Sequence, residues 1–148
     1  MEAEHQTTLD VVCARIGSTL TRIRRVHYEF QGTLDREKGD IELWFDDRVL
    51  WFRCASNGQD LRVEQEGWKD HFAPPLSPEN EAFVRESGHE VAVDVSDTPP
   101  YNDLVKHDVD AVEPVVDQWQ HLIGVCVRAG GAALRIYVDA DELFVTPG

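Results

Sequence analysis

The sequence predicts an α+β fold, mainly antiparallel β-sheet built from two hairpin halves, with an N-terminal helix and a short middle helix. Two apolar stretches, residues 39–54 and 123–138, each alternate as a β-hairpin, and short strands flank both of them. The segments with helical signals are the N-terminal stretch and residues 77–88. A chain of 148 residues has the length of one domain, so we expect residues 1–148 to share one core.

The N-terminal helix is predicted from apolar residues that recur at steps of three and four, which places them on one helical face. These residues are Leu9, Val12, Cys13, Ile16, Leu20 and Ile23. After Arg25 the period changes to two, because Val26, Tyr28 and Phe30 alternate with polar residues. This alternation is typical of a half-buried strand.

The first hairpin is predicted to turn at Asp47-Arg48. One of its faces then holds only apolar side chains, those of Ile41, Leu43, Phe45, Leu50, Phe52 and Cys54. On the other face Trp44 lies opposite Trp51, and Glu42 lies opposite Arg53. Such cross-strand pairs stabilise a sheet by about 0.2–1 kcal/mol each. We expect a helix to cover this second face, so that both indoles are buried. An exposed tryptophan pair would instead mark a contact surface.

The middle of the chain contains the second predicted helix. Ser77 is suited to cap it, Pro78 suits its first position, and Gly88 follows its end. Residues 89–96 alternate as a strand, and two prolines in the stretch 97–108 predict a loop.

The second hairpin is predicted to turn at Gly130-Gly131, a favoured two-residue turn. Its inner face pairs Val127 with Leu134, Val125 with Ile136 and Ile123 with Val138. The extended stretch before it contains Pro114, which favours an edge strand. Residues 24–66 and 108–146 thus follow one plan with little sequence identity. Two interpretations stay open: two copies of one unit, or two ordinary meanders.

Charge sets the class of partner that we expect. The net charge of −14 disfavours binding to nucleic acid or to an anionic membrane, and it attracts basic proteins. Half of this charge lies in residues 90–117, where the acids are Glu90, Asp94, Asp97, Asp103, Asp108, Asp110, Glu113 and Asp117 and the one base is Lys106. This acidic tract has two interpretations, a solvated face or a docking patch for a basic protein.

The sequence contains no catalytic, nucleotide-binding or metal-binding motif that we consider specific. His107, Asp108 and Asp110 form the densest titratable group, without the spacing of a metal site. The cysteines Cys13, Cys54 and Cys126 predict reduced thiols. The polar, acidic N-terminus and the lack of a long apolar run predict a cytoplasmic protein. The lack of catalytic motifs favours a non-enzymatic role, without cofactor or metal, over an enzymatic one.

In its small size, strong acidity and lack of catalytic motifs, the chain resembles the small acidic immunity proteins that bacteria keep against toxins. The resemblance implies a non-enzymatic inhibitor that occludes a basic toxin domain, and it transfers no individual residues. The alternatives are a ligand-binding or enzymatic domain whose pocket uses tryptophans, including Trp119, and aspartates, or a structural homodimer that pairs one of the hairpins. The candidate binding residues are Trp44, Trp51, Asp94, Asp97, Asp103, Asp108 and Asp110.

Overall fold

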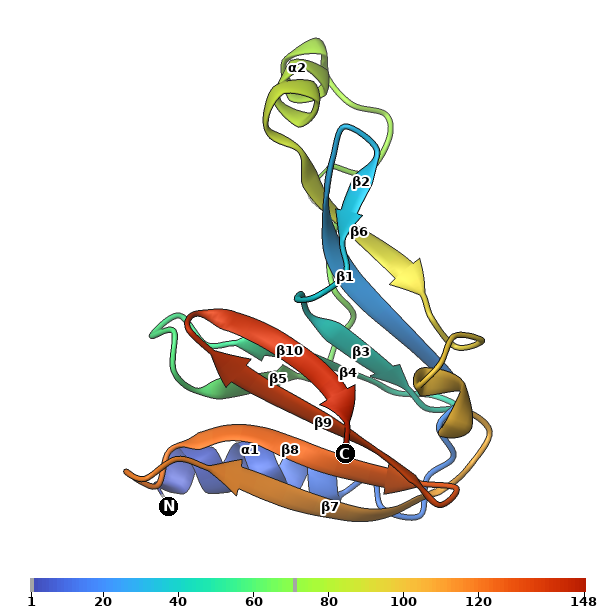
Figure 1. Cartoon of the computed structure of the whole chain (residues 1–148), viewed down its shortest axis with the longest axis vertical. Coiled ribbons are helices and arrows are strands. Elements are labelled where there is room, and N and C mark those ends of the chain that lie inside the picture. Colours follow the sequence, from blue (N-terminus) through green and yellow to red (C-terminus); the bar gives the residue numbers. More distant parts are fainter. Residues whose placement is uncertain (1, 71) are drawn as a thin grey trace.

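A computed structural model describes residues 2–70 and 72–148 (Figure 1). It confirms the α+β class, with two antiparallel sheets, an N-terminal helix and a middle helix. The helices are α1 (Ala3–Cys13) and α2 (Pro78–Ser87), and a 3₁₀ turn spans Tyr101–Asp103. No helix in the described part of the chain is long and apolar enough to cross a membrane.

The first sheet has the strand order β2-β1-β3-β4-β5, with β6 paired to the free side of β1. Its strands are β1 (Arg22–Phe30), β2 (Thr33–Asp35), β3 (Ile41–Trp44), β4 (Val49–Cys54), β5 (Leu61–Glu64) and β6 (His89–Asp94). The second sheet has the order β10-β9-β8-β7. Its strands are β7 (Val109–Val116), β8 (Leu122–Ala129), β9 (Ala132–Asp139) and β10 (Glu142–Pro147).

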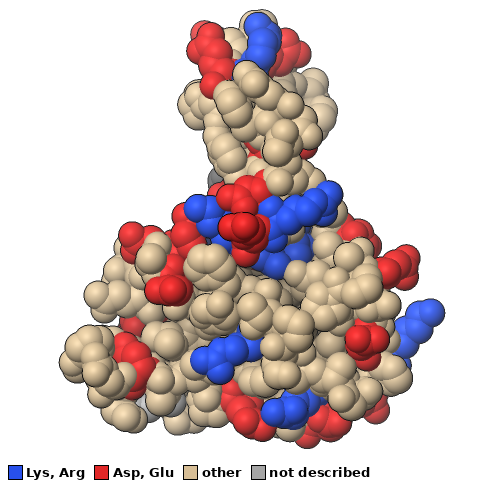
Figure 2. Space-filling view, viewed as in Figure 1, with Lys and Arg blue, Asp and Glu red and all other residues tan. Residues whose placement is uncertain are grey.

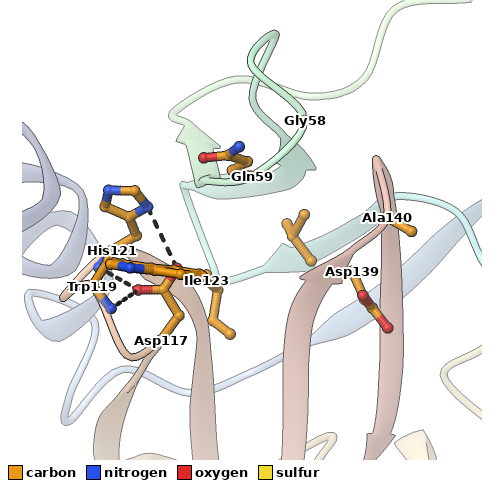
Figure 3. A pocket seen from close by; sticks show the side chains of 9 residues that line it. Gly58, Gln59, Asp117, Trp119, His121, Ile123, Asp139 and Ala140 are labelled. Atoms are coloured by element: carbon orange, nitrogen blue, oxygen red, sulfur yellow. Dashed lines mark hydrogen bonds and ion pairs between the residues drawn. The ribbon is translucent and has the colours of Figure 1, made fainter.

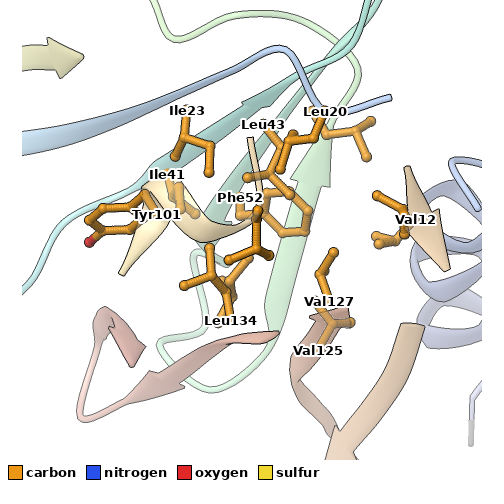
Figure 4. Close-up of a cluster of buried hydrophobic side chains, with 14 of the residues drawn as sticks. Val12, Leu20, Ile23, Ile41, Leu43, Phe52, Tyr101, Val125, Val127 and Leu134 are labelled. Carbon is orange, nitrogen blue, oxygen red and sulfur yellow. The ribbon is translucent and has the colours of Figure 1, made fainter. Parts of the chain in front are cut away.

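The two sheets pack face to face and enclose the core, with β4 against β9 and β10, and β5 against β8. Figure 4 shows the buried side chains that meet there. They include Ile23, Ile41, Leu43 and Phe52 from the first sheet, and Val125, Val127 and Leu134 from the second. Helix α1 packs against β5 and β7 and adds Val12 to the core. Successive side chains of a strand point to opposite faces of its sheet, so each sheet can turn one apolar face toward the other.

Strand β1 continues beyond the sandwich into a projecting lobe, which we call the head (Figure 1). The head consists of α2, β2, the C-terminal half of β1 and the N-terminal half of β6. Helix α2 has the predicted start, because the Ser77 side chain accepts a hydrogen bond from the Asn80 amide at 3.1 Å. The C-terminal half of β1 thus pairs with β2 in the head, whereas its N-terminal half pairs with β3 in the sandwich.

The first hairpin has the predicted faces but a different register. Its tip is Asp46-Asp47 and not Asp47-Arg48, since the Phe45 amide donates to the Arg48 carbonyl at 2.8 Å. Glu42 therefore lies opposite Trp51, and Trp44 lies opposite Val49. A shift of two residues along one strand leaves every side chain on its own face, so the apolar pattern alone could not detect it.

The N-terminal helix is shorter than the apolar period suggested. It ends at Cys13, and Gly17 adopts φ of 88°, a left-handed conformation that suits glycine. Leu20 and Ile23 are buried in the core, but Ile23 belongs to β1 and Leu20 precedes it. The apolar residues that fit one helical period in the sequence therefore belong to α1, to the connection after it and to β1.

The second hairpin has the predicted register, with Val127 opposite Leu134 and Val125 opposite Ile136. Strand β7, which contains Pro114, is at the edge of its sheet as predicted. Each sheet contains four strands that lie side by side in chain order, β1-β3-β4-β5 in the first and β7-β8-β9-β10 in the second. Along the chain, however, β2 comes between β1 and β3, and the second set has no such extra strand. Duplication of one unit stays a prediction.

Candidate binding site at the end of the sandwich

A cavity of about 470 Å³ lies at one end of the sandwich, where three chain connections meet. They are the β4–β5 loop with Gly58 and Gln59, the β7–β8 turn, and the β9–β10 turn with Ala140. Figure 3 shows Trp119, His121 and Asp117 on one side of the cavity, with Asp139 and Ala140 across from them. The volume falls within the range of small-molecule pockets.

Trp119 is presented by a tightly bonded turn. The Asp117 carboxylate accepts hydrogen bonds from the Trp119 and His121 amides, both at 2.9 Å. The Asp117 amide donates to the His121 carbonyl at 3.1 Å, so the turn is closed by backbone bonding as well. The Trp119 side chain is nonetheless 69% exposed. The sequence therefore places a large apolar side chain in solvent on a turn that is closed by hydrogen bonds.

Two histidines and two aspartates brace this turn against the rest of the molecule. Nε2 of His5, on α1, lies 3.2 Å from Oδ2 of Asp60 in the β4–β5 loop. Nδ1 of His121 lies 3.4 Å from Oδ2 of Asp117 and 4.0 Å from Oδ1 of Asp60. The two imidazole rings meet edge to face at 5.8 Å. The cluster thus joins α1, the β4–β5 loop and the β7–β8 turn.

The groups around Asp60 favour the ionised form of its carboxyl group. Burial raises the pKa of Asp60, but hydrogen bonds from Asn57 and His5 and the charges of the two histidines outweigh it, so the pKa lies below its usual value. Nδ1 of His5, Nδ1 of His121 and Oδ1 of Asp60 are buried without a hydrogen-bond partner. An imidazole that borders a cavity beside a carboxylate can exchange protons with a bound ligand. Among the described residues, no three His, Cys, Asp or Glu side chains are arranged to hold a metal ion.

The structure places Trp44 and Trp51 on the outer face of the first sheet, half-buried. Both side chains keep part of their surface exposed, so the prediction that a helix buries both indoles is wrong. Arginines cover the rings instead. The Arg22 and Arg24 guanidinium carbons lie 5.6 and 5.7 Å from the Trp44 ring, and that of Arg53 lies 4.9 Å from Trp51. Both rings are thus engaged in cation–π contacts within the chain.

The five candidate aspartates are all exposed but do not form one group. Asp94 shares the outer face with the tryptophans and pairs with Arg22 at 2.9 Å. Asp97 follows β6, Asp103 is in the 3₁₀ turn, and Asp110 belongs to the second sheet. Asp108 accepts a hydrogen bond from the Thr19 hydroxyl at 2.6 Å. On the face of the molecule drawn in Figure 2, acidic side chains are likewise scattered and interleaved with basic ones.

Asp40 is a titratable group that the sequence interpretation missed. Its carboxylate accepts a hydrogen bond from Nε1 of Trp51 at 2.8 Å. Burial raises the pKa of Asp40 to about 6, and the nearby charge of Glu90 adds to this, although the Trp51 bond and the charges of Arg53 and Arg25 oppose it. Asp40 therefore changes its charge close to neutral pH.

We expect Asp40→Asn to remove a pH dependence of stability. Between the ordinary pKa of 3.8 and the folded value of about 6, the unfolded chain is ionised while the folded chain retains the proton. The free energy of unfolding of the natural chain should therefore fall as pH rises through this window, by up to about 3 kcal/mol relative to the variant. Urea unfolding at several pH values measures the difference. Parallel curves for the two proteins would contradict it.

No protein-family model, curated protein or solved structure matches this chain. The site is therefore interpreted from its own geometry. The sequence interpretation had named Trp119 and Asp117, but not as neighbours of His5, Asp60 and His121. The sequence does contain one local signal for the turn. Asp117 precedes Trp119 by two residues, a spacing at which an aspartate carboxylate can accept a hydrogen bond from the backbone amide. His5 and Asp60 join the site only through tertiary packing.

Proposed function

We propose that this protein is a non-enzymatic binding protein that uses Trp119 to anchor a basic protein partner. The observation that supports the proposal is a tryptophan that is 69% exposed on a turn closed by side-chain and backbone hydrogen bonds. Tryptophans are enriched among the residues that dominate binding energy at protein interfaces. The hydrogen bonds fix the backbone that presents the indole, so less backbone freedom is lost on binding.

Charge defines the partner. Asp117 and Asp139 line the cavity beside Trp119, and the chain as a whole has a net charge of −14. An arginine or lysine of the partner could contact the indole face and a carboxylate together. The long-range field of the chain would also accelerate association with a basic protein. A basic toxin domain held by an immunity-type inhibitor is one form that such a partner would take.

A peptide-display selection tests this proposal. Random peptides are selected on the natural protein alone, with no counter-selection on a variant. We expect the survivors to be rich in arginine and lysine. Their affinity should fall about 30-fold or more for Trp119→Ala, because an anchor residue contributes about 2 kcal/mol or more. Titration calorimetry on synthetic peptides measures this ratio.

The matched control is Phe83→Ala, which removes another exposed aromatic side chain at the head, away from this site. It should leave peptide affinity unchanged. Survivors without basic residues, or survivors that bind both variants equally, would overturn the proposal.

A second candidate, a small-ligand or enzymatic pocket, is favoured by one observation: His121 and Asp117 border a cavity of about 470 Å³. A thermal-shift screen with small metabolites distinguishes it, because a ligand stabilises the folded state by mass action. A shift that His121→Asn abolishes would support this candidate. Peptide binding that His121→Asn leaves intact would support the first.

A further inference from the structure

A second cavity, of about 320 Å³, lies in the head and is lined mainly by aromatic rings. Tyr28 comes from β1, Phe83 from α2 and His89 from β6, while Trp68 and Phe72 come from the segment between β5 and α2. Five ring-bearing side chains from four parts of the chain thus surround one space. We call it the aromatic pocket.

The rings of the aromatic pocket support one another and stay accessible. Phe72 and Phe83 are stacked with centroids 5.5 Å apart and planes 12° apart, and His89 meets Phe72 edge to face at 6.4 Å. Tyr28 packs against Gly88, where an added Cβ would lie 2.8 Å from the Tyr28 hydroxyl oxygen. Phe83 and Tyr28 are 51% and 45% exposed. These rings form an open wall that a ligand can reach without disturbing the sandwich core.

The charges at the aromatic pocket are negative. Asp70 and Glu90 line it, and Glu90 lies directly opposite Tyr28 in the pairing of β1 with β6. Among its described lining residues there is no lysine or arginine. Aromatic faces carry negative quadrupole charge, so the rings and the carboxylates favour the same ligand charge.

We propose that the aromatic pocket binds a quaternary ammonium group. A trimethylammonium cation presents methyl groups to the rings and a positive charge to Asp70 and Glu90. It is also weakly hydrated, whereas a primary ammonium keeps strongly bound water. An anion would meet two carboxylates, and a neutral apolar ligand would make no use of them. A volume of about 320 Å³ accommodates such a head group with a short attached chain.

Nuclear magnetic resonance titrations with choline test this proposal, with dimethylbutanol, its neutral carbon isostere, as the matched ligand. We expect choline to bind about threefold to thirtyfold more tightly than the isostere, the range of a cation–π contribution. Its methyl protons should shift upfield, because they lie over ring faces. Equal affinity for the two ligands, or no saturable binding of choline, would overturn the proposal.

Variants locate the site. Phe83→Ala removes one wall and Glu90→Gln removes one charge, and both side chains are exposed, so the fold should persist. Each should weaken choline binding by about threefold or more. Trp119→Ala should leave it unchanged, because Trp119 belongs to the other cavity. Weakening by Trp119→Ala alone would assign the cation to that cavity and overturn the proposal.

The source of the group is a separate arm of the experiment. A peptide with a trimethylated lysine is compared with free choline and with the same peptide unmethylated. Tighter binding of the methylated peptide would indicate a modified protein as the source, and tighter binding of choline would indicate a free metabolite. This proposal does not rest on the proposed function, since the two sites respond to different variants.

Discussion

Phe52→Ala is expected to lower the free energy of unfolding by about 3–5 kcal/mol. Phe52 has no exposed surface and lies on β4 between Ile41 of β3 and Val63 of β5. Its strand packs against β9 and β10 of the opposite sheet. Removal of the ring would leave a cavity between two sheets, and their hydrogen-bonded strands cannot collapse into it.

Urea unfolding monitored by circular dichroism measures this loss. Phe144→Ala is the matched control, because Phe144 is half-buried on β10 and stacks on Tyr137 at 5.7 Å, outside the core cluster. Its loss should be clearly smaller. If Phe52→Ala does not fold, Phe52→Leu keeps most of the volume and should cost on the order of 1 kcal/mol. Equal losses at positions 52 and 144 would contradict a core centred between the sheets.

The faces of the strands could be predicted from the sequence because alternation has a period of two. The turn of the first hairpin could not, because a shift of two residues preserves that alternation. The structure places Asp46 and Asp47 at the exposed tip. Aspartate suits turn positions, so local turn chemistry decided between registers that the apolar pattern leaves equivalent.

The sites illustrate a different limit. Tertiary packing brings together His5, Asp60 and His121, which are dozens of residues apart in the chain. The aromatic pocket depends on a segment that crosses from β5 to the head, where the sequence shows no regular period. The tryptophan face was predicted, but its arginine cover was not, since cation–π contacts leave no mark on hydrophobic periodicity.

Glu42→Ala is the second change with a large expected effect, a loss of about 3–5 kcal/mol in the free energy of unfolding. Glu42 has no exposed surface, and its carboxylate accepts hydrogen bonds from Nε of Arg24, from Nε1 of Trp44 at 3.2 Å and from the Trp68 amide at 2.8 Å. Alanine would leave a guanidinium and two N–H donors without their acceptor. These donors are half-buried, and leaving them without an acceptor costs more than the net worth of the bonds that are lost.

The pH dependence of Glu42 has a definite sign. Burial raises its pKa, but the bonds from Arg24, the Trp68 amide and Trp44 outweigh burial, so the pKa lies below its usual value. The stability that ionised Glu42 contributes is therefore present above the unfolded pKa and is lost as pH falls through the folded pKa. Relative to Glu42→Gln, the advantage of the natural chain should shrink on acidification. An advantage that grows at low pH would contradict this assignment.

The same carboxylate connects the sandwich to the aromatic pocket. The Trp68 amide is bonded to Glu42, and Trp68 and Asp70 line that pocket. Glu42→Gln exchanges one acceptor for an amide and loosens the segment at its attachment to the sheet. It should therefore weaken choline binding, whereas Phe52→Leu, which also destabilises the sandwich, should not. If Glu42→Gln and Phe52→Leu bind choline equally well, the aromatic pocket forms without the bond between Glu42 and the Trp68 amide. The contacts within the head alone would then hold its rings in place.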